Sequence, residues 1–329
     1  MECVICLEKY DTHKRLPRRL SCGHTFCTSC IILVMKHSGP LRCAYCRSRH
    51  SGPVLCPADL SIHREMLGRI IEADQNDNTS QENDGSNSQQ EPPQLSVLKL
   101  REAASNANDS GGKLWACIVG ENDDGVGRYA QVTLINNRLH LHALHDGQPP
   151  TDDQTVPYER VYELVDEDAI IIFFEVCLGG NTQGRVYVLL LDNEGRTQQF
   201  KALCTGQRGP SYTGTRFLEV QRIHNCLQVW GGDYENNDGS GGAALSGMQR
   251  GTQNHQDIEA GLVAGYYFPG YGCDHNPSQF CIYVNNLPGY YEMSSIGRVI
   301  GGLEIITNVA NLNDVREAYV SECGLLLSH

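Results

Sequence analysis

The sequence predicts a multidomain protein with a small metal-stabilised α+β module, a disordered linker, a small β region and a larger β-rich domain. Seven of the 15 cysteines fall within residues 3–46. A polar stretch at residues 74–94 has no aliphatic or aromatic side chain, and short apolar runs separated by glycines dominate residues 168–329. The 329 residues also exceed the usual length of a single domain, which is roughly 150 residues.

Charge is unevenly distributed along the chain. Residues 1–50 contain nine Lys or Arg and three Asp or Glu, a formal charge of +6, whereas the whole chain carries −13. Because clustered cations supply most of the affinity for nucleic acids, the acidic remainder argues against a nucleic-acid partner. The basic N-terminal segment suits an acidic protein partner.

The close spacing of the N-terminal cysteines favours metal binding over disulfide bonds. No leader-like segment precedes Cys3, and no apolar run approaches the roughly 18 residues that a membrane span needs. We therefore expect no membrane partner and a cytoplasmic or nuclear location, where thiols stay reduced.

Eight potential zinc ligands occur as closely spaced pairs. They are Cys3, Cys6, Cys22, His24, Cys27, Cys30, Cys43 and Cys46. A two-residue step lets one tight turn present two sulfurs to the same ion, so two structural Zn²⁺ ions in closed tetrahedral sites account for all eight. Since few apolar residues separate the ligands, metal binding itself would supply folding free energy, on the order of 10 kcal/mol.

The ligand order of three Cys, one His and four Cys over residues 1–50 resembles the RING finger family. The position of the histidine argues against a PHD finger or a LIM domain. The resemblance implies that the ligand pairs interleave between the two ions. One site would contain Cys3, Cys6, Cys27 and Cys30, and the other Cys22, His24, Cys43 and Cys46.

RING domains recruit a ubiquitin-conjugating enzyme charged with ubiquitin and orient its thioester without supplying a nucleophile. The resemblance implies that Ile5 contacts this enzyme and that Arg47 positions the donor ubiquitin. Val34 stands where many members have Trp, and Ala44 replaces a common Pro, so the contact at Val34 is apolar but smaller. The alternative is a RING fold that only dimerises or docks.

A helix and a linker are predicted after the RING-like segment. Asp59–Ile71 carry apolar residues at helical spacing with Asp59 as the N-cap, so we expect a flanking helix within residues 51–72. Residues 73–112 are predicted to be a disordered linker, because their polar central stretch cannot offset the entropy lost on ordering.

Residues 113–165 are predicted to form a small β region of unknown role. Their alternating pattern surrounds Asn136 and Asn137, which tolerate the positive φ of a tight hairpin turn. We expect His140, His142 and His145 to face solvent rather than to bind metal, because no fourth ligand is spaced to join them.

The domain at residues 166–329 is predicted to be a β-barrel or sandwich with helices at 193–203 and 302–309. Short segments along this domain resemble segments of cyclophilins and occur in the same order. They include FFEV (173–176), GRVYVLLL (184–191), FKALCTGQRG (200–209), SYTGTRF (211–217), WGGDY (230–234), DGSGG (238–242), SQF (278–280), IGRV (296–299) and ECG (322–324). The resemblance implies an eight-stranded β-barrel capped by two helices.

Cyclophilins are peptidyl-prolyl isomerases that use an arginine beside an apolar pocket to speed rotation about X-Pro bonds. Counted back from Gly231, Arg222 takes the position of that arginine; counted forward from Phe217, Glu219 does. The resemblance places four departures from the family in the pocket wall: Leu227, Gln228, Trp230 and Cys281. Because aromatic surface is lost, partner binding without catalysis is favoured over isomerisation, and a structural remnant is the third reading.

Six aromatic residues cluster in two Gly/Pro-rich loops of this domain: Tyr266, Tyr267, Phe268, Tyr271, Tyr290 and Tyr291. They form either a recognition surface or loop packing. Together, the features favour a RING-type ubiquitin ligase, an E3 transferase, whose tethered cyclophilin-like domain binds an unknown protein substrate. The alternatives are a prolyl isomerase with an accessory RING and a non-catalytic scaffold.

Overall fold

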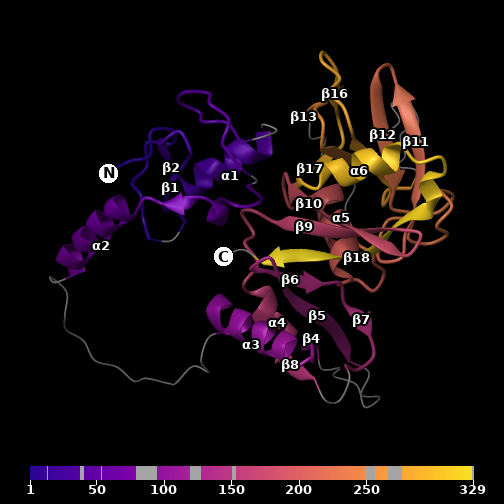
Figure 1. Ribbon diagram of the computed structural model, residues 1–329, viewed down its shortest axis with the longest axis horizontal. Coiled ribbons are helices and arrows are strands. Elements are labelled where there is room, and N and C mark those ends of the chain that lie inside the picture. Colours follow the sequence, from indigo (N-terminus) through magenta and orange to yellow (C-terminus); the bar gives the residue numbers. More distant parts are fainter. Residues whose placement is uncertain are drawn as a thin grey trace. The chain divides into compact units, whose positions relative to one another are not determined.

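The structure, a computed structural model, describes residues 1–12, 14–37, 41–52, 54–78, 95–118, 127–149, 153–248, 256–265 and 276–327. The chain divides into two units, Met1–Gln94 and Leu95–His329. Figure 1 labels their helices and strands. None of the helices in the described ranges combines the length and the hydropathy needed to cross a membrane.

The N-terminal unit has the predicted α+β composition. Its sheet has the order β2-β1-β3, formed by β1 (Pro17–Arg19), β2 (Thr25–Cys27) and β3 (Ser61–Ile62). Helix α1 (Thr28–His37) follows β2 directly and buries Cys30, Ile31, Ile32 and Met35. Strand β2 and helix α1 therefore fix the segment that carries the third pair of predicted zinc ligands.

This unit extends beyond the predicted boundary at residue 50. Strand β3 pairs with β1, and the backbone N–H of His63 donates to the carbonyl of Pro17 at 2.8 Å. The buried Arg18 donates from Nη1 to the carbonyl of Leu60 at 3.1 Å. Since a buried guanidinium needs partners of this kind, the segment around Leu60 is part of the fold.

The flanking helix begins later than predicted. Helix α2 spans Arg64–Asn78, and Asp59 ends a short 3-10 helix, Pro57–Asp59, instead of capping α2. The Asp59 carboxylate accepts hydrogen bonds from the backbone N–H groups of Leu55 (2.7 Å) and Cys56 (3.0 Å). Because these bonds and the β3 pairing hold the chain, helical backbone starts only at Arg64.

The C-terminal unit is a large β-sheet-rich body. Its main sheet contains β4 (Leu114–Ile118), β5 (Arg128–Ile135), β6 (Arg138–His142), β7 (His145–Asp146), β8 (Gln154–Pro157), β9 (Ile171–Leu178), β10 (Asn181–Leu190), β11 (Phe217–Ile223), β12 (Cys226–Gly231), β14 (Leu262–Gly265), β15 (Phe280–Tyr283), β17 (Ser295–Gly301) and β18 (Ala318–Leu327). A separate ladder joins β13 (Gln256–Asp257) to β16 (Tyr291–Glu292). Its helices are α3 (Val97–Asp109), α4 (Tyr158–Tyr162), α5 (Gly195–Thr205) and α6 (Leu303–Ala310).

The strand order is β11-β12-β15-β14-β17-β10-β9-β18-β6-β5-β4-β8, with β7 beside β5. This path is open, so the predicted closed eight-stranded barrel is not found among the described residues. An isolated bridge between Arg216 and Tyr319 connects the segment just before β11 with β18. The two predicted helices are present as α5 and α6, within two residues of the predicted bounds.

Residues 113–165 are not a separate β region. Strand β6 pairs with β18 from Leu139 opposite Leu327 to His142 opposite Gly324, so its hairpin belongs to the main sheet. In Figure 1, β18 lies between β9 and β6. A single apolar core contains Leu114 from β4, Phe174 from β9 and Leu325 from β18. The boundary predicted at residue 165 therefore divides one folded unit.

The predicted linker at 73–112 also contains ordered structure. Helix α3 starts after Ser96, whose side chain accepts a hydrogen bond from the backbone N–H of Lys99 at 3.3 Å. Its Leu100, Ala104 and Ala107 are buried in the main core, at the spacing of one helix face. Of this linker, residues 79–94 lie outside the described residues.

The turn prediction for the β5–β6 hairpin is confirmed, because Asn136 and Asn137 have φ of 51° and 60°.

The prediction of solvent-facing histidines is wrong for two of the three. His140 is 0% exposed and His142 is 5% exposed, whereas His145 is exposed. The reason is that β6 becomes an interior strand of the sheet when β18 pairs with it.

Candidate zinc centres and docking surface

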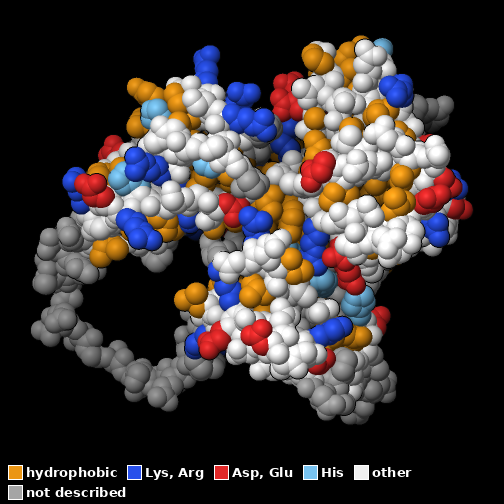
Figure 2. All heavy atoms as spheres, viewed as in Figure 1, with side chains coloured by type: hydrophobic (Ala, Val, Ile, Leu, Met, Phe, Trp, Pro, Cys, Tyr) orange, Lys and Arg blue, Asp and Glu red, His pale blue; other side chains and the backbone are white. Residues whose placement is uncertain are grey.

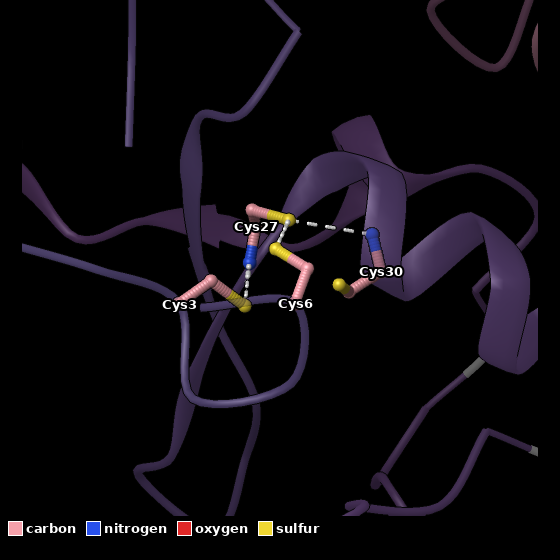
Figure 3. A group of neighbouring side chains, drawn as sticks. All are labelled: Cys3, Cys6, Cys27 and Cys30. Carbon is pink, nitrogen blue, oxygen red and sulfur yellow. Dashed lines mark hydrogen bonds between the residues drawn. The ribbon is translucent and has the colours of Figure 1, made fainter. Parts of the chain in front are cut away.

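The first ligand cluster contains four cysteines from two segments. Cys3 and Cys6 flank the first tight turn, Cys27 ends β2, and Cys30 lies in the first turn of α1. Their four Sγ atoms lie within 4.8 Å of one another, and the Sγ atoms of Cys6 and Cys27 are 3.8 Å apart. Figure 3 shows the sulfurs converging. Four convergent thiols are the donor set of a structural zinc site.

The second cluster contains Cys22, His24, Cys43 and Cys46, whose ligand atoms also lie within 4.8 Å of one another. The Sγ of Cys22 and the Nδ1 of His24 are 3.4 Å apart. The ring of Tyr45 lies against the His24 ring in a tilted arrangement, with centroids 4.8 Å apart. The ligands of the two clusters therefore interleave along the chain, and both clusters fit Zn²⁺.

Two short segments, which carry the first and the last ligand pair, have the same backbone conformation. We call residues 2–10 the first zinc turn and residues 42–50 the second zinc turn. In the first, the N–H of Cys3 donates to the carbonyl of Glu8 (2.9 Å) and that of Leu7 to Cys3 (2.8 Å). In the second, Cys43 donates to Ser48 (2.9 Å) and Arg47 to Cys43 (2.8 Å).

Each zinc turn contains a residue in the left-handed region, since Leu7 and Arg47 each have φ of 61°. A non-glycine residue at positive φ is uncommon, and it persists only where the surrounding structure holds it there. The hydrogen bonds around the paired cysteines provide that constraint. The position of Arg47 is therefore fixed by the metal site that precedes it.

Metal binding and thiol ionisation are coupled at these sites. Burial and the neighbouring thiols raise the pKa of Cys27 to about 11, and burial raises the pKa of Cys30 still further above its usual value. Hydrogen bonding with Ser48 lowers the pKa of the exposed Cys46 to about 6. Because zinc binds thiolates, loading the sites releases protons, and acid favours release of the metal.

The predicted contacts for a conjugating enzyme lie at the surface of this unit. Ile5 is 40% exposed, Val34 on α1 is partly buried, and Arg47 is exposed. Sequence analysis missed Tyr45, which is 73% exposed and occupies in the second zinc turn the position that Ile5 has in the first. The repeated Cys-x2-Cys turn was the signal that could have identified it.

The predicted isomerase pocket is only partly assembled. Gln228, Trp230 and Cys281 lie together: Trp230 pairs with Cys281 across β12 and β15, and its Nε1 donates to Oε1 of Gln228 at 3.3 Å. All three are buried, with exposed fractions of 3%, 8% and 1%. These three side chains therefore belong to the packed interior and do not line an open surface.

Arg222 is not brought to this group. It pairs with Leu227, whereas Glu219 pairs with Trp230, so pleat alternation places Arg222 and Leu227 on the opposite face from Trp230. Of the six loop aromatics, Tyr290 and Tyr291 are exposed, and the other four lie outside the described residues.

The match with a known family covers the zinc sites. Residues 1–47 match the ring finger domain family, a span that includes all eight ligands. The N-terminal part of the chain is therefore a RING finger region with two zinc-binding clusters.

Proposed function

We propose that this chain is a RING-type ubiquitin ligase that recruits a conjugating enzyme charged with ubiquitin. The observation that carries the proposal is the pair of interleaved zinc clusters within the segment that matches the ring finger family. Each cluster uses four protein ligands, so neither leaves a coordination position for chemistry. The zinc ions would act as scaffolding, and the unit would act by binding and orientation.

The exposed side chains around the zinc turns support a docking role. Ile5 and Tyr45 offer apolar area at equivalent positions of the two turns, and Val34 adds a third apolar contact. Arg47 is exposed and held at positive φ one residue beyond the last ligand. A cation fixed in this way can restrict the thioester-linked ubiquitin to fewer orientations, which is how positioning raises a rate.

We propose that the C-terminal body is a cyclophilin-like module that binds the protein substrate. The order of its segments and the positions of α5 and α6 support this assignment. Exposed aromatics support a binding surface: Tyr290 lies against His224 in a tilted arrangement with ring centroids 5.4 Å apart, and Tyr291 is 63% exposed. A tether would keep a bound substrate near the charged enzyme.

Discharge of ubiquitin from a pre-charged conjugating enzyme tests the ligase proposal. With zinc-loaded full chain and a panel of conjugating enzymes, we expect discharge to rise with at least one member. Ile5→Ala and Arg47→Ala should each lower the rate about tenfold, as expected for loss of a central interface contact. Arg64→Ala, at an exposed position of α2, is the matched control. No discharge with any member, or unchanged discharge by Arg47→Ala, would overturn the proposal.

Prolyl isomerisation is the alternative activity. The buried Gln228, Trp230 and Cys281 and the register of Arg222 do not support it. An assay with a proline tetrapeptide distinguishes the two functions: isomerisation that is abolished by Arg222→Ala would favour the alternative, and we expect no such activity.

A further inference from the structure

Strand β11 lies at one end of the strand path of the main sheet, with β12 on only one side of it. In Figure 1, the two strands lie at the end of the body away from β6. The first part of the outer edge of β11 is covered, since Nε of Arg316 donates to the carbonyl of Leu218 at 3.3 Å. Beyond it, no described residue forms a backbone hydrogen bond to the outer edge at Val220–Ile223. We call Val220–Ile223 the free edge of β11.

The hairpin that joins β11 to β12 determines which backbone groups point outward. Ile223 pairs with Cys226 across a two-residue turn, and the pair that flanks such a turn exchanges both of its hydrogen bonds. Bonded and non-bonded pairs alternate, so the next pair, Arg222 with Leu227, exchanges none. Accordingly, the carbonyl of Leu227 accepts from the residue that follows β15, at 2.8 Å. The N–H and C=O groups of Arg222, and by the same alternation those of Val220, therefore point away from β12.

The side chains at this edge combine apolar area with two opposite charges. Ile223 is 42% exposed, and beyond it Tyr290, 50% exposed, lies against His224. Glu219 and Arg222 are exposed, and among the described residues neither forms an ion pair. Figure 2 shows hydrophobic, basic and histidine side chains together at the end of the body that carries β11 and β12. Unpaired backbone groups beside exposed apolar side chains favour pairing with another strand.

We propose that the free edge of β11 binds an extended segment of a protein substrate as an additional antiparallel strand. This inference rests on the proposed substrate-binding role of the C-terminal body, and it names the kind of segment bound there. The segment would pair its own N–H and C=O groups with those of Val220 and Arg222. Addition of a strand to an exposed sheet edge provides affinity through the backbone and specificity through alternate side chains.

The exposed side chains define the chemistry of the segment. Residues directly opposite each other in an antiparallel pair lie on the same face and interact. An apolar residue would therefore lie opposite Ile223, an acidic one opposite Arg222 and a basic one opposite Glu219. From its N-terminus, the segment carries an apolar, an acidic, any, an apolar and a basic residue. Proline is excluded at the acidic and second apolar positions, because both must donate an N–H group.

Binding is measured with the fluorescein-labelled peptide Thr-Val-Glu-Thr-Val-Lys-Thr and the zinc-loaded full chain. Exchange of Glu and Lys keeps the composition but places like charges opposite Arg222 and Glu219, so it should weaken binding about tenfold at low salt. Methylation of the second valine nitrogen removes the hydrogen bond to Val220 and should weaken binding at least about tenfold. Equal affinity of the three peptides, or no detectable binding of the first, overturns the proposal.

A proline substitution tests the outward N–H group in the protein itself. Arg222→Pro removes a donor that β12 does not use, and proline is tolerated at such positions of edge strands. Arg222→Ala is the matched control, because it removes the charge and keeps the N–H. We expect Arg222→Ala to weaken peptide binding about threefold and Arg222→Pro to weaken it at least about tenfold more. Equal binding by the two folded variants contradicts the proposed strand pairing.

Amide hydrogen exchange of the wild-type chain decides the question if Arg222→Pro does not fold. Without peptide, the amides of Val220 and Arg222 should exchange much faster than those of Gln221 and Ile223, which donate to β12. Saturating peptide should slow exchange at Val220 and Arg222 at least about tenfold. No added protection at these two amides overturns the proposal.

Transfer of ubiquitin to the same peptide, extended by a lysine-containing tail, connects the edge to the ligase function. The peptide should be modified faster than its N-methylated form, and equal rates overturn its assignment as a substrate segment. If the chain discharges a conjugating enzyme but binds no peptide, the strand proposal fails while the ligase proposal stands. If the peptide protects Val220 and Arg222 but no conjugating enzyme is discharged, the ligase proposal fails while the binding edge stands.

Discussion

The zinc unit and the C-terminal body are stabilised by different means. In the zinc unit, eight ligands converge on two clusters, while Val4, Leu7, Leu33 and Tyr45 remain more than half exposed. In the body, a large apolar core joins residues from Leu100 to Leu327, and a smaller cluster contains Trp230 and Cys281. Where metal supplies the folding free energy, large apolar side chains need not be buried in a core, and they can stay at the surface for binding.

Removal of zinc should have the largest effect on stability, and it should unfold one unit without the other. Chelation at neutral pH is expected to unfold residues 1–71, because the loss is on the order of 10 kcal/mol, while the body stays folded. Amide hydrogen exchange read separately for α1 and β9 measures this. Simultaneous loss of protection in both, or in neither, would contradict the comparison.

A core substitution in α3 should affect only the body. Leu100 is 0% exposed and Leu98 on the same helix is 75% exposed. Leu100→Ala should destabilise the body by roughly 2–5 kcal/mol through lost contacts and a cavity, whereas Leu98→Ala should change stability by less than about 0.5 kcal/mol. Urea denaturation of the two variants provides the measurement. Equal effects would mean that residues 97–109 do not contribute to the core.

The buried His140 should make the body sensitive to acid. Burial, and then the charge of Arg185, lowers the pKa of His140 to about 3 from its ordinary value of 6.5. Below pH 6.5 the unfolded chain binds a proton that the folded chain does not, so stability falls with decreasing pH from about 6.5 toward 3. By pH 4.5 the loss from this group would be about 3 kcal/mol.

His140→Gln should flatten that pH dependence, and His145→Gln, at an exposed position, should change it much less. Hydrogen exchange of β6 and β18 across this range measures the body without interference from zinc release. A slope that survives in His140→Gln would show that another group controls it.

The smallest expected effect is at the start of α3. Ser96→Ala removes the side-chain acceptor for the Lys99 N–H and should cost about 1 kcal/mol of body stability. Ser105→Ala, within the same helix, is the control and should be close to neutral. If the two variants have the same stability, the Ser96 cap does not stabilise α3.

The zinc ligands were predictable because their chemistry is local: two residues separate most pairs, and a single turn satisfies the spacing. Helix α3 was not predictable, because its buried face consists only of Leu100 and two alanines within a polar sequence. The burial of His140 depends on β18, which lies far along the chain. The position of Arg222 depends on a register shift between Phe217 and Glu219, which side-chain patterns do not reveal.

The pairing of β18 with both β6 and β9 has a consequence for synthesis on the ribosome. The zinc ligands are all made within the first 46 residues, so the RING region can load metal while most of the chain is untranslated. The body, in contrast, exposes the hydrogen-bonding edges of β6 and β9 until residues 318–327 emerge. This interval is when the nascent chain is most prone to aggregate and most dependent on chaperones.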